Sequence, residues 1–165
     1  MVSCRMSGSG ATALRRRAMD LLARREHSRC ELARRLRDRF PEADAESVEE
    51  VLVRLAGENL QSDRRFAEEY VRMRMRRGFG WLHIRADLQS RGVDADIIAG
   101  LSPPEDEWLA LAENLVASRL RGQVGLAPGS RDHQRLFRFM LSRGFPADIA
   151  RKSLQNCGRF RSASV

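Results

Sequence analysis

Apolar residues recur along this chain at the three- and four-residue spacing of amphipathic helices, and no segment alternates apolar and polar residues as a half-buried strand would. The clearest example lies at 61–92, where two apolar stripes follow one another on either side of a Gly78-Phe79-Gly80 corner. The stripes consist of Phe66, Tyr70 and Met73, and then of Trp81, Ile84 and Leu88. The pattern predicts an all-α protein, with Phe66 and Tyr70 in its core.

Capping residues and helix breakers divide the periodic sequence into helices. The first helix is expected at about 11–25 and another at about 105–121. The expected N-caps are Ser28, Asp44, Ser62, Asp94 and Ser130. Ser28 and Glu31 have the spacing of a capping box. Pro146 suits the first position of a last helix that ends near Asn156.

An internal repeat groups these helices. The sequence S-R-G-x-x-A-D-I occurs at 90–97 and again at 142–149, and 36–41 contains a looser echo of it. The repeat predicts three tandem three-helix modules at 11–59, 60–101 and 104–156, between a flexible N-terminus at 1–10 and a flexible tail at 157–165. Because modules this small bury little surface alone, we expect them to contact end to end in an elongated, curved array.

Charge narrows the possible partners. The chain of 165 residues has a net charge of +8, and every basic residue except Lys152 is an Arg. The positive charge is spread along the chain, which favours an anionic partner: a nucleic acid, an acidic protein face or a membrane surface. No apolar run reaches the length of a transmembrane helix, and the N-terminus lacks the apolar core of a signal peptide. We therefore expect a cytoplasmic protein.

Residues of the types that catalyse reactions or bind metals lie scattered along the sequence. Cys4, Cys30 and Cys157 lie far apart and have neither a disulfide framework nor metal-ligand spacing. The three His residues form no H-x-x-x-H pair, and His83 is expected on the solvated side of its helix. No phosphate-binding loop motif occurs. We expect no metal, no cofactor and no enzymatic activity.

Basic residues in the helix that begins near Asp63 are the candidate binding site. Since an α-helix turns by about 100° per residue, Arg65, Arg72 and Arg76 fall within about 40° of one another. Arg74 and Arg77 add charge at the end of the helix. Such a line could contact a phosphate backbone without reading its sequence. Acidic residues in the same helix leave the alternative of a solvated face open.

The two Trp residues have two interpretations. Trp81 and Trp108 could stack on the bases of a single-stranded nucleic acid. Their helical spacing with Ile84 and Leu111 favours core packing.

Two segments resemble the RecX family of regulatory proteins. The first is L-L-A-R-R-E-H-S-R-C-E-L-A-R-R-L at 21–36, which is similar to the family's opening, L-x-x-R-x-x-S-x-x-E-L-x-x-K-L. The second is L-Q-S-D-R-R-F-A-E-E-Y-V at 60–71, which resembles its central signature and is continued by G-F-G at 78–80 and R-G-V at 91–93. The resemblance covers about 11–156; F-P-E-A-D at 40–44 departs from the usual Gly-containing turn, and the third module matches only weakly.

The resemblance implies a small bacterial cytoplasmic protein that modulates the RecA recombinase in recombination, DNA repair and the SOS response. Such proteins are all-α and are not enzymes. They lie in the groove of the RecA filament on single-stranded DNA and inhibit its extension, ATP hydrolysis, strand exchange and coprotease activity. We expect this chain to act in the same way, as a monomer, through Arg65, Arg72, Arg74, Arg76 and Arg77.

Two alternatives remain open at this point. The chain could be a sequence-independent nucleic-acid-binding module with no protein target, or a helical scaffold whose Arg faces pair with acidic proteins.

Overall fold

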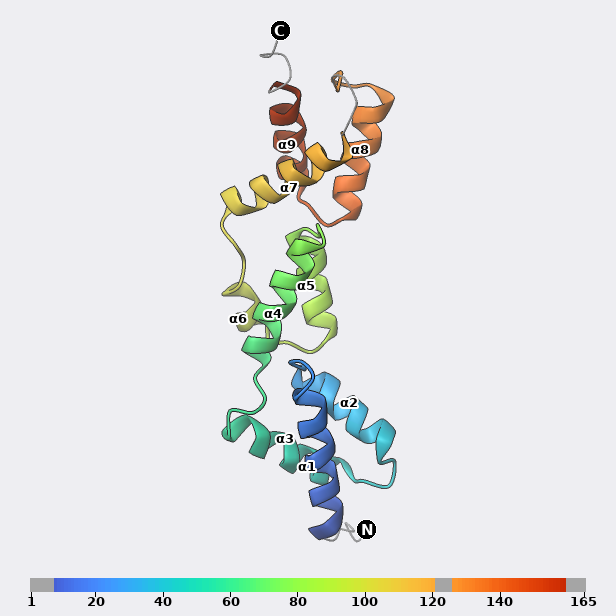
Figure 1. Cartoon of the computed structure of the whole chain (residues 1–165), viewed down its shortest axis with the longest axis vertical. Coiled ribbons are helices and arrows are strands. Elements are labelled where there is room, and N and C mark those ends of the chain that lie inside the picture. Colours follow the sequence, from blue (N-terminus) through green and yellow to red (C-terminus); the bar gives the residue numbers. More distant parts are fainter. Residues whose placement is uncertain (1–7, 121–125, 160–165) are drawn as a thin grey trace. The chain divides into compact units, whose positions relative to one another are not determined.

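The computed structural model describes residues 8–120 and 126–159, and every regular element in these ranges is an α-helix (Figure 1). The helices are α1 (Gly8–Leu22), α2 (Arg29–Arg39), α3 (Ala45–Gly57), α4 (Asp63–Arg76), α5 (Trp81–Ser90), α6 (Ala95–Ala99), α7 (Glu105–Arg119), α8 (Arg131–Ser142) and α9 (Ala147–Arg159). The predicted all-α class is confirmed. The predicted flexible ends, 1–10 and 157–165, lie largely outside the described residues.

Side chains cap the helices at the predicted positions. The Ser28 hydroxyl accepts a hydrogen bond from the Glu31 amide at 3.1 Å, and the Ser130 hydroxyl accepts one from the His133 amide at 3.2 Å. The Asp44 carboxylate caps α3 through the Ser47 amide at 2.6 Å. Each bond satisfies an amide that the first turn of a helix leaves without a partner.

Several helix ends differ from the predicted ones by two or three residues, and the C-terminal ends of α1 and α9 are two of them. α1 ends at Leu22 instead of near Arg25, because the Arg24 amide bonds to the Leu21 carbonyl in a tight turn. α9 continues past Asn156 to Arg159. Both differences are of the size expected where helix ends fray.

The chain forms two compact units. The first consists of 1–70 and 88–100, and the second of 71–87 and 101–165. Helices α4 and α5 therefore each contribute to both units. The division into three modules remains a prediction.

Each unit has its own apolar core. In the first, α1, α2 and α3 pack on one another around residues that include Leu14, Leu32, Leu36, Leu52 and Leu55. In the second, α9 packs against α7 and α8 (Figure 1). Its most buried side chains include Val116, Met140, Phe145 and Leu154. No described helix is long and apolar enough to cross a membrane.

Candidate interaction surfaces and the repeated Arg-Gly turn

Glu31 lies at the centre of a buried ionic cluster in the first unit. Its side chain is 5% exposed, and its carboxylate lies 3.2 Å from His27 Nδ1 and 3.2 Å from Arg25 Nη1. Arg91 from the turn after α5 binds the other carboxylate oxygen and lays its guanidinium over the Tyr70 ring, 4.8 Å from the ring centre. The sequence predicted only a capping role for Glu31. Its carboxylate is instead used for these contacts, across a long separation in sequence.

Two pKa values in this cluster are shifted downward. Burial alone would raise the pKa of Glu31, but the neighbouring Arg25 and Arg91 guanidinium groups outweigh it and lower the pKa. Burial, assisted by Arg25, lowers the pKa of His27 below its ordinary value. His27 is therefore favoured in its neutral form in the folded protein.

A pH dependence follows from the His27 pKa. When the folded pKa is below the unfolded one, the unfolded state binds more protons, so stability falls as the pH decreases. We expect the free energy of unfolding to start falling as the pH drops below about 6.5, the ordinary pKa of His27, before Glu31 contributes.

Urea unfolding at a series of pH values would measure this effect, with His27→Gln as the matched variant. The variant should show a flatter dependence between about pH 6.5 and about pH 5. An equally steep dependence in both proteins would assign the effect to other groups.

The Arg91-Gly92 turn also fixes the start of α2 through its backbone. The Ser28 hydroxyl donates a hydrogen bond to the Arg91 carbonyl at 2.8 Å. Gly92 has a φ of +72°, and a Cβ added there would lie 2.7 Å from the Cys30 Cβ. Only glycine fits this approach without movement of α2.

The Arg143-Gly144 turn makes an equivalent contact with the start of α5 in the second unit. The Arg143 carbonyl accepts a hydrogen bond from the Gly80 amide at 2.8 Å, and the Gly144 carbonyl accepts one from the Leu82 amide at 3.0 Å. Gly144 has a φ of +85°, and a Cβ there would lie 2.5 Å from the His83 backbone nitrogen. The Arg143 guanidinium lies over Phe79, 4.7 Å from the ring centre.

The repeated Ser-Arg-Gly sequence therefore makes the same contact with another helix in both units, and we call this contact a joint. In each unit the Gly packs against the first turn of another helix, and the Arg carbonyl accepts a hydrogen bond from the N-cap position of that helix. In each unit the Arg guanidinium lies on an aromatic ring. The repeat is visible in the sequence, but its structural role can be recognised only from the contacts in the structure.

The structure separates the five predicted contact residues into two groups. Arg72, Arg76 and Arg77 are exposed, and their side chains make no hydrogen bond or ion pair with a described residue. Arg65 is bound within its unit: it donates to the Glu26 carboxylate at 2.8 Å and to the Asn59 side chain at 2.7 Å. Arg74 is 16% exposed, pairs with Asp87 and lies over the Phe79 ring at 3.8 Å.

His83 and the two Trp residues have packing contacts. His83, expected in solvent, is partly buried, and the centre of its ring lies 4.8 Å from the centre of the Phe79 ring. Trp108 is buried, and Trp81 lies beside it with ring centres 6.2 Å apart. These contacts favour the core-packing interpretation of both Trp residues.

The described residues contain no group of three His, Cys, Asp or Glu side chains that could hold a metal ion. Cys30 and Cys157 are free thiols, and Cys4 lies outside the described residues.

Comparisons with known proteins agree on one family. Residues 15–55 match the model of the first three-helix domain of RecX, and residues 62–100 match that of its second three-helix domain. The chain is 44% identical to the regulatory protein RecX of Pseudomonas entomophila (strain L48) over 138 residues, which cover 83% of this chain and 86% of that protein. It is 39% identical to the RecX of Pseudomonas syringae pv. tomato over 147 residues, which cover 88% and 92%.

Solved structures support the fold. The crystal structure of RecX from Lactobacillus salivarius matches with a TM-score of 0.78 at 19% identity, covering 92% of this chain and 98% of that one. A second crystal structure of a regulatory protein RecX matches with a TM-score of 0.73 at 22% identity, covering 89% and 72%. The identity to curated relatives over most of their length, together with the two domain matches, shows that this chain belongs to the RecX family of regulatory proteins.

Proposed function

We propose that this protein binds the RecA filament on single-stranded DNA and inhibits its extension, ATP hydrolysis, strand exchange and coprotease activity. Membership in the RecX family is the observation that carries this proposal. The protein would act in the cytoplasm, as a monomer, by occupying a surface and without a catalytic step. This mode of action needs neither a metal nor a cofactor.

The exposed guanidinium groups of α4 and the turn after it are the proposed contact surface. Arg72, Arg76 and Arg77 have no internal partner among the described residues, so binding an anionic surface would break no existing ion pair. Arg65 and Arg74 are already bound to carboxylates of their own units. We therefore assign the first three to contact with the filament or its DNA, and the other two to positioning of α4.

RecA's DNA-dependent ATP hydrolysis would test the proposed function. Inhibition at protein concentrations far below those needed to coat the DNA would support action on the filament. Inhibition that starts only near coating would contradict it, and would favour a sequence-independent nucleic-acid-binding module.

Charge reversal would test the contact surface. Arg72→Glu combined with Arg76→Glu should preserve helical content, because both side chains are exposed, and should weaken inhibition by about tenfold or more. The measurement is the protein concentration that halves the rate of ATP hydrolysis.

A double variant with the same charge change elsewhere provides the control. Arg16→Glu with Arg37→Glu alters two exposed residues that have no ion pair among the described residues. Equal inhibition by the two double variants would remove Arg72 and Arg76 from the contact surface.

A further inference from the structure

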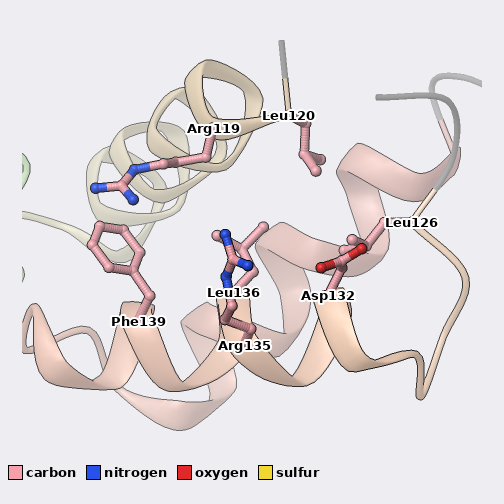
Figure 2. A pocket seen from close by; sticks show the side chains of 7 residues that line it. All are labelled: Arg119, Leu120, Leu126, Asp132, Arg135, Leu136 and Phe139. Carbon is pink, nitrogen blue, oxygen red and sulfur yellow. The ribbon is translucent and has the colours of Figure 1, made fainter. Parts of the chain in front are cut away.

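A pocket of about 200 Å³ lies between the end of α7 and the first half of α8 in the second unit (Figure 2). Side chains of both helices and of the residues next to them line it: Arg119, Leu120, Leu126, Asp132, Arg135, Leu136 and Phe139. Figure 2 shows Arg135 and Asp132 rising from α8 toward the end of α7, where the Arg119 guanidinium lies over the Phe139 ring. The pocket is thus lined by both apolar and charged side chains.

Helices α2, α5 and α8 can be aligned through the Arg-containing turn that follows each of them. In this alignment, the pocket face of α8 corresponds to the faces of α2 and α5 that contact an Arg-Gly turn. Leu36, Leu88 and Met140 are fully buried at equivalent positions, and four residues earlier stand the buried Leu32, Ile84 and Leu136. The residue just before this second set is Glu31 in α2 and His83 in α5. Glu31 binds Arg91, and His83 packs against Gly144. In α8 the same position is occupied by Arg135.

The face of α8 therefore carries the opposite charge to the face of α2. Where Glu31 receives an Arg, Arg135 would repel one. Arg135 is exposed and makes no hydrogen bond or ion pair with any described residue. Across its length α8 contains Arg131, Arg135 and Arg138 but only one acidic residue, Asp132. The face is suited to a ligand that brings carboxylates.

We propose that this pocket binds an acidic segment of a partner protein, whose carboxylates pair with Arg135 and Arg119 while one apolar side chain packs against Leu120, Leu136 and Phe139. Arg is well suited to pairing with carboxylates because its planar guanidinium can bind both oxygens. The apolar side chains in the lining offer a contact for a protein side chain that a phosphate backbone could not use, and Asp132 would repel a continuous row of phosphates.

A second copy of this chain is a poor fit. The turn that such a copy could offer is Arg39-Phe40-Pro41, because Arg91-Gly92 and Arg143-Gly144 are already used in joints. That turn has no glycine, and its Arg would face Arg135. No residue of α4 lines this pocket, and the inference goes beyond the proposed function.

Fluorescence polarisation with the full chain, without RecA or DNA, would test the proposal. The probe is a fluorescein-labelled peptide, Glu-Glu-Leu-Phe-Glu-Glu, and a Gln-Gln-Leu-Phe-Gln-Gln peptide tests the need for charge. We expect saturable binding of the acidic peptide that weakens with added salt, and much weaker binding of the neutral one. Arg135→Glu should raise the Kd about tenfold or more.

Arg138→Glu is the matched control, because Arg138 is an exposed residue of the same helix that does not line the pocket. It should change the Kd by no more than about twofold. Far-UV circular dichroism would confirm that both variants keep their helices. Charge-swapped peptide, Lys-Lys-Leu-Phe-Lys-Lys, should bind Arg135→Glu better than the wild type.

Either of two results would overturn the proposal. One is the absence of saturable binding of the acidic peptide, and the other is an equal loss of affinity for it in Arg135→Glu and Arg138→Glu. A labelled oligothymidine that binds the wild type and Arg138→Glu but not Arg135→Glu, while the peptide does not bind, would assign the face to nucleic acid instead. Because neither RecA nor the α4 variants are involved, failure here leaves the filament test unaffected.

Discussion

Gly144→Ala is expected to lower the free energy of unfolding by about 2–5 kcal/mol. Gly144 has a φ of +85°, where an alanine costs about 1–2 kcal/mol. The added Cβ would also lie 2.5 Å from both the backbone nitrogen and the Cβ of His83, and overpacking of this kind adds about 1–3 kcal/mol. Urea unfolding followed by circular dichroism would measure the loss.

Substitutions at two other glycines separate the backbone cost of Gly144→Ala from the cost of its close contact with His83. Gly129 has a similar φ of +78° but no described atom within 4 Å of an added Cβ, so Gly129→Ala should cost only the backbone part, about 1–2 kcal/mol. Gly57 ends α3 in open space without a positive φ, and Gly57→Ala should be neutral or slightly stabilising. If Gly144→Ala lowered the free energy of unfolding no more than Gly129→Ala, the close contact with His83 would not contribute to the loss of stability.

Glu31→Ala is expected to cost about 3 kcal/mol of stability, the lower end of the range for breaking a buried ion pair. The carboxylate is 5% exposed, and its removal leaves His27 and two guanidinium groups beside one another. The lower end applies because Arg25 and Arg91 are 45% and 35% exposed and can turn toward water. Glu31→Gln should lose less than Glu31→Ala, since an amide still accepts hydrogen bonds.

Glu49 provides the control for this measurement. It pairs with Arg29 on the surface and is 55% exposed, so Glu49→Ala should change stability by about 1 kcal/mol or less. Equal effects of Glu31→Ala and Glu49→Ala in urea unfolding would contradict a structural role for the buried cluster.

Features fixed by nearby residues could be predicted from the sequence. The Ser28, Asp44 and Ser130 caps each bond to an amide three residues later, so one turn of sequence contains all the necessary information. The apolar periodicity likewise identified Phe66, Ile84 and Leu88, which are buried, whereas Tyr70 is only partly buried. The all-α class followed from these local signals.

The interactions across long stretches of sequence could not be predicted in this way. Glu31 looked like a capping-box acid, because its partner Arg91 comes 60 residues later in the chain. Arg65 looked like a free member of a basic line, because nothing in its own helix shows that Glu26 and Asn59 bind it. Helical spacing tells which side chains share a face, but not which of them another segment already occupies.

The division of α4 and α5 between the compact units bears on how the protein can be shortened. A fragment that ended at residue 100 would contain both matched family domains, yet it would keep 71–87 without the rest of the second unit. The Gly80 and Leu82 amides would lose their acceptors, and Trp81 would lose the indole beside it. Truncation to the recognisable domains would thus yield an aggregation-prone product in place of a minimal regulator.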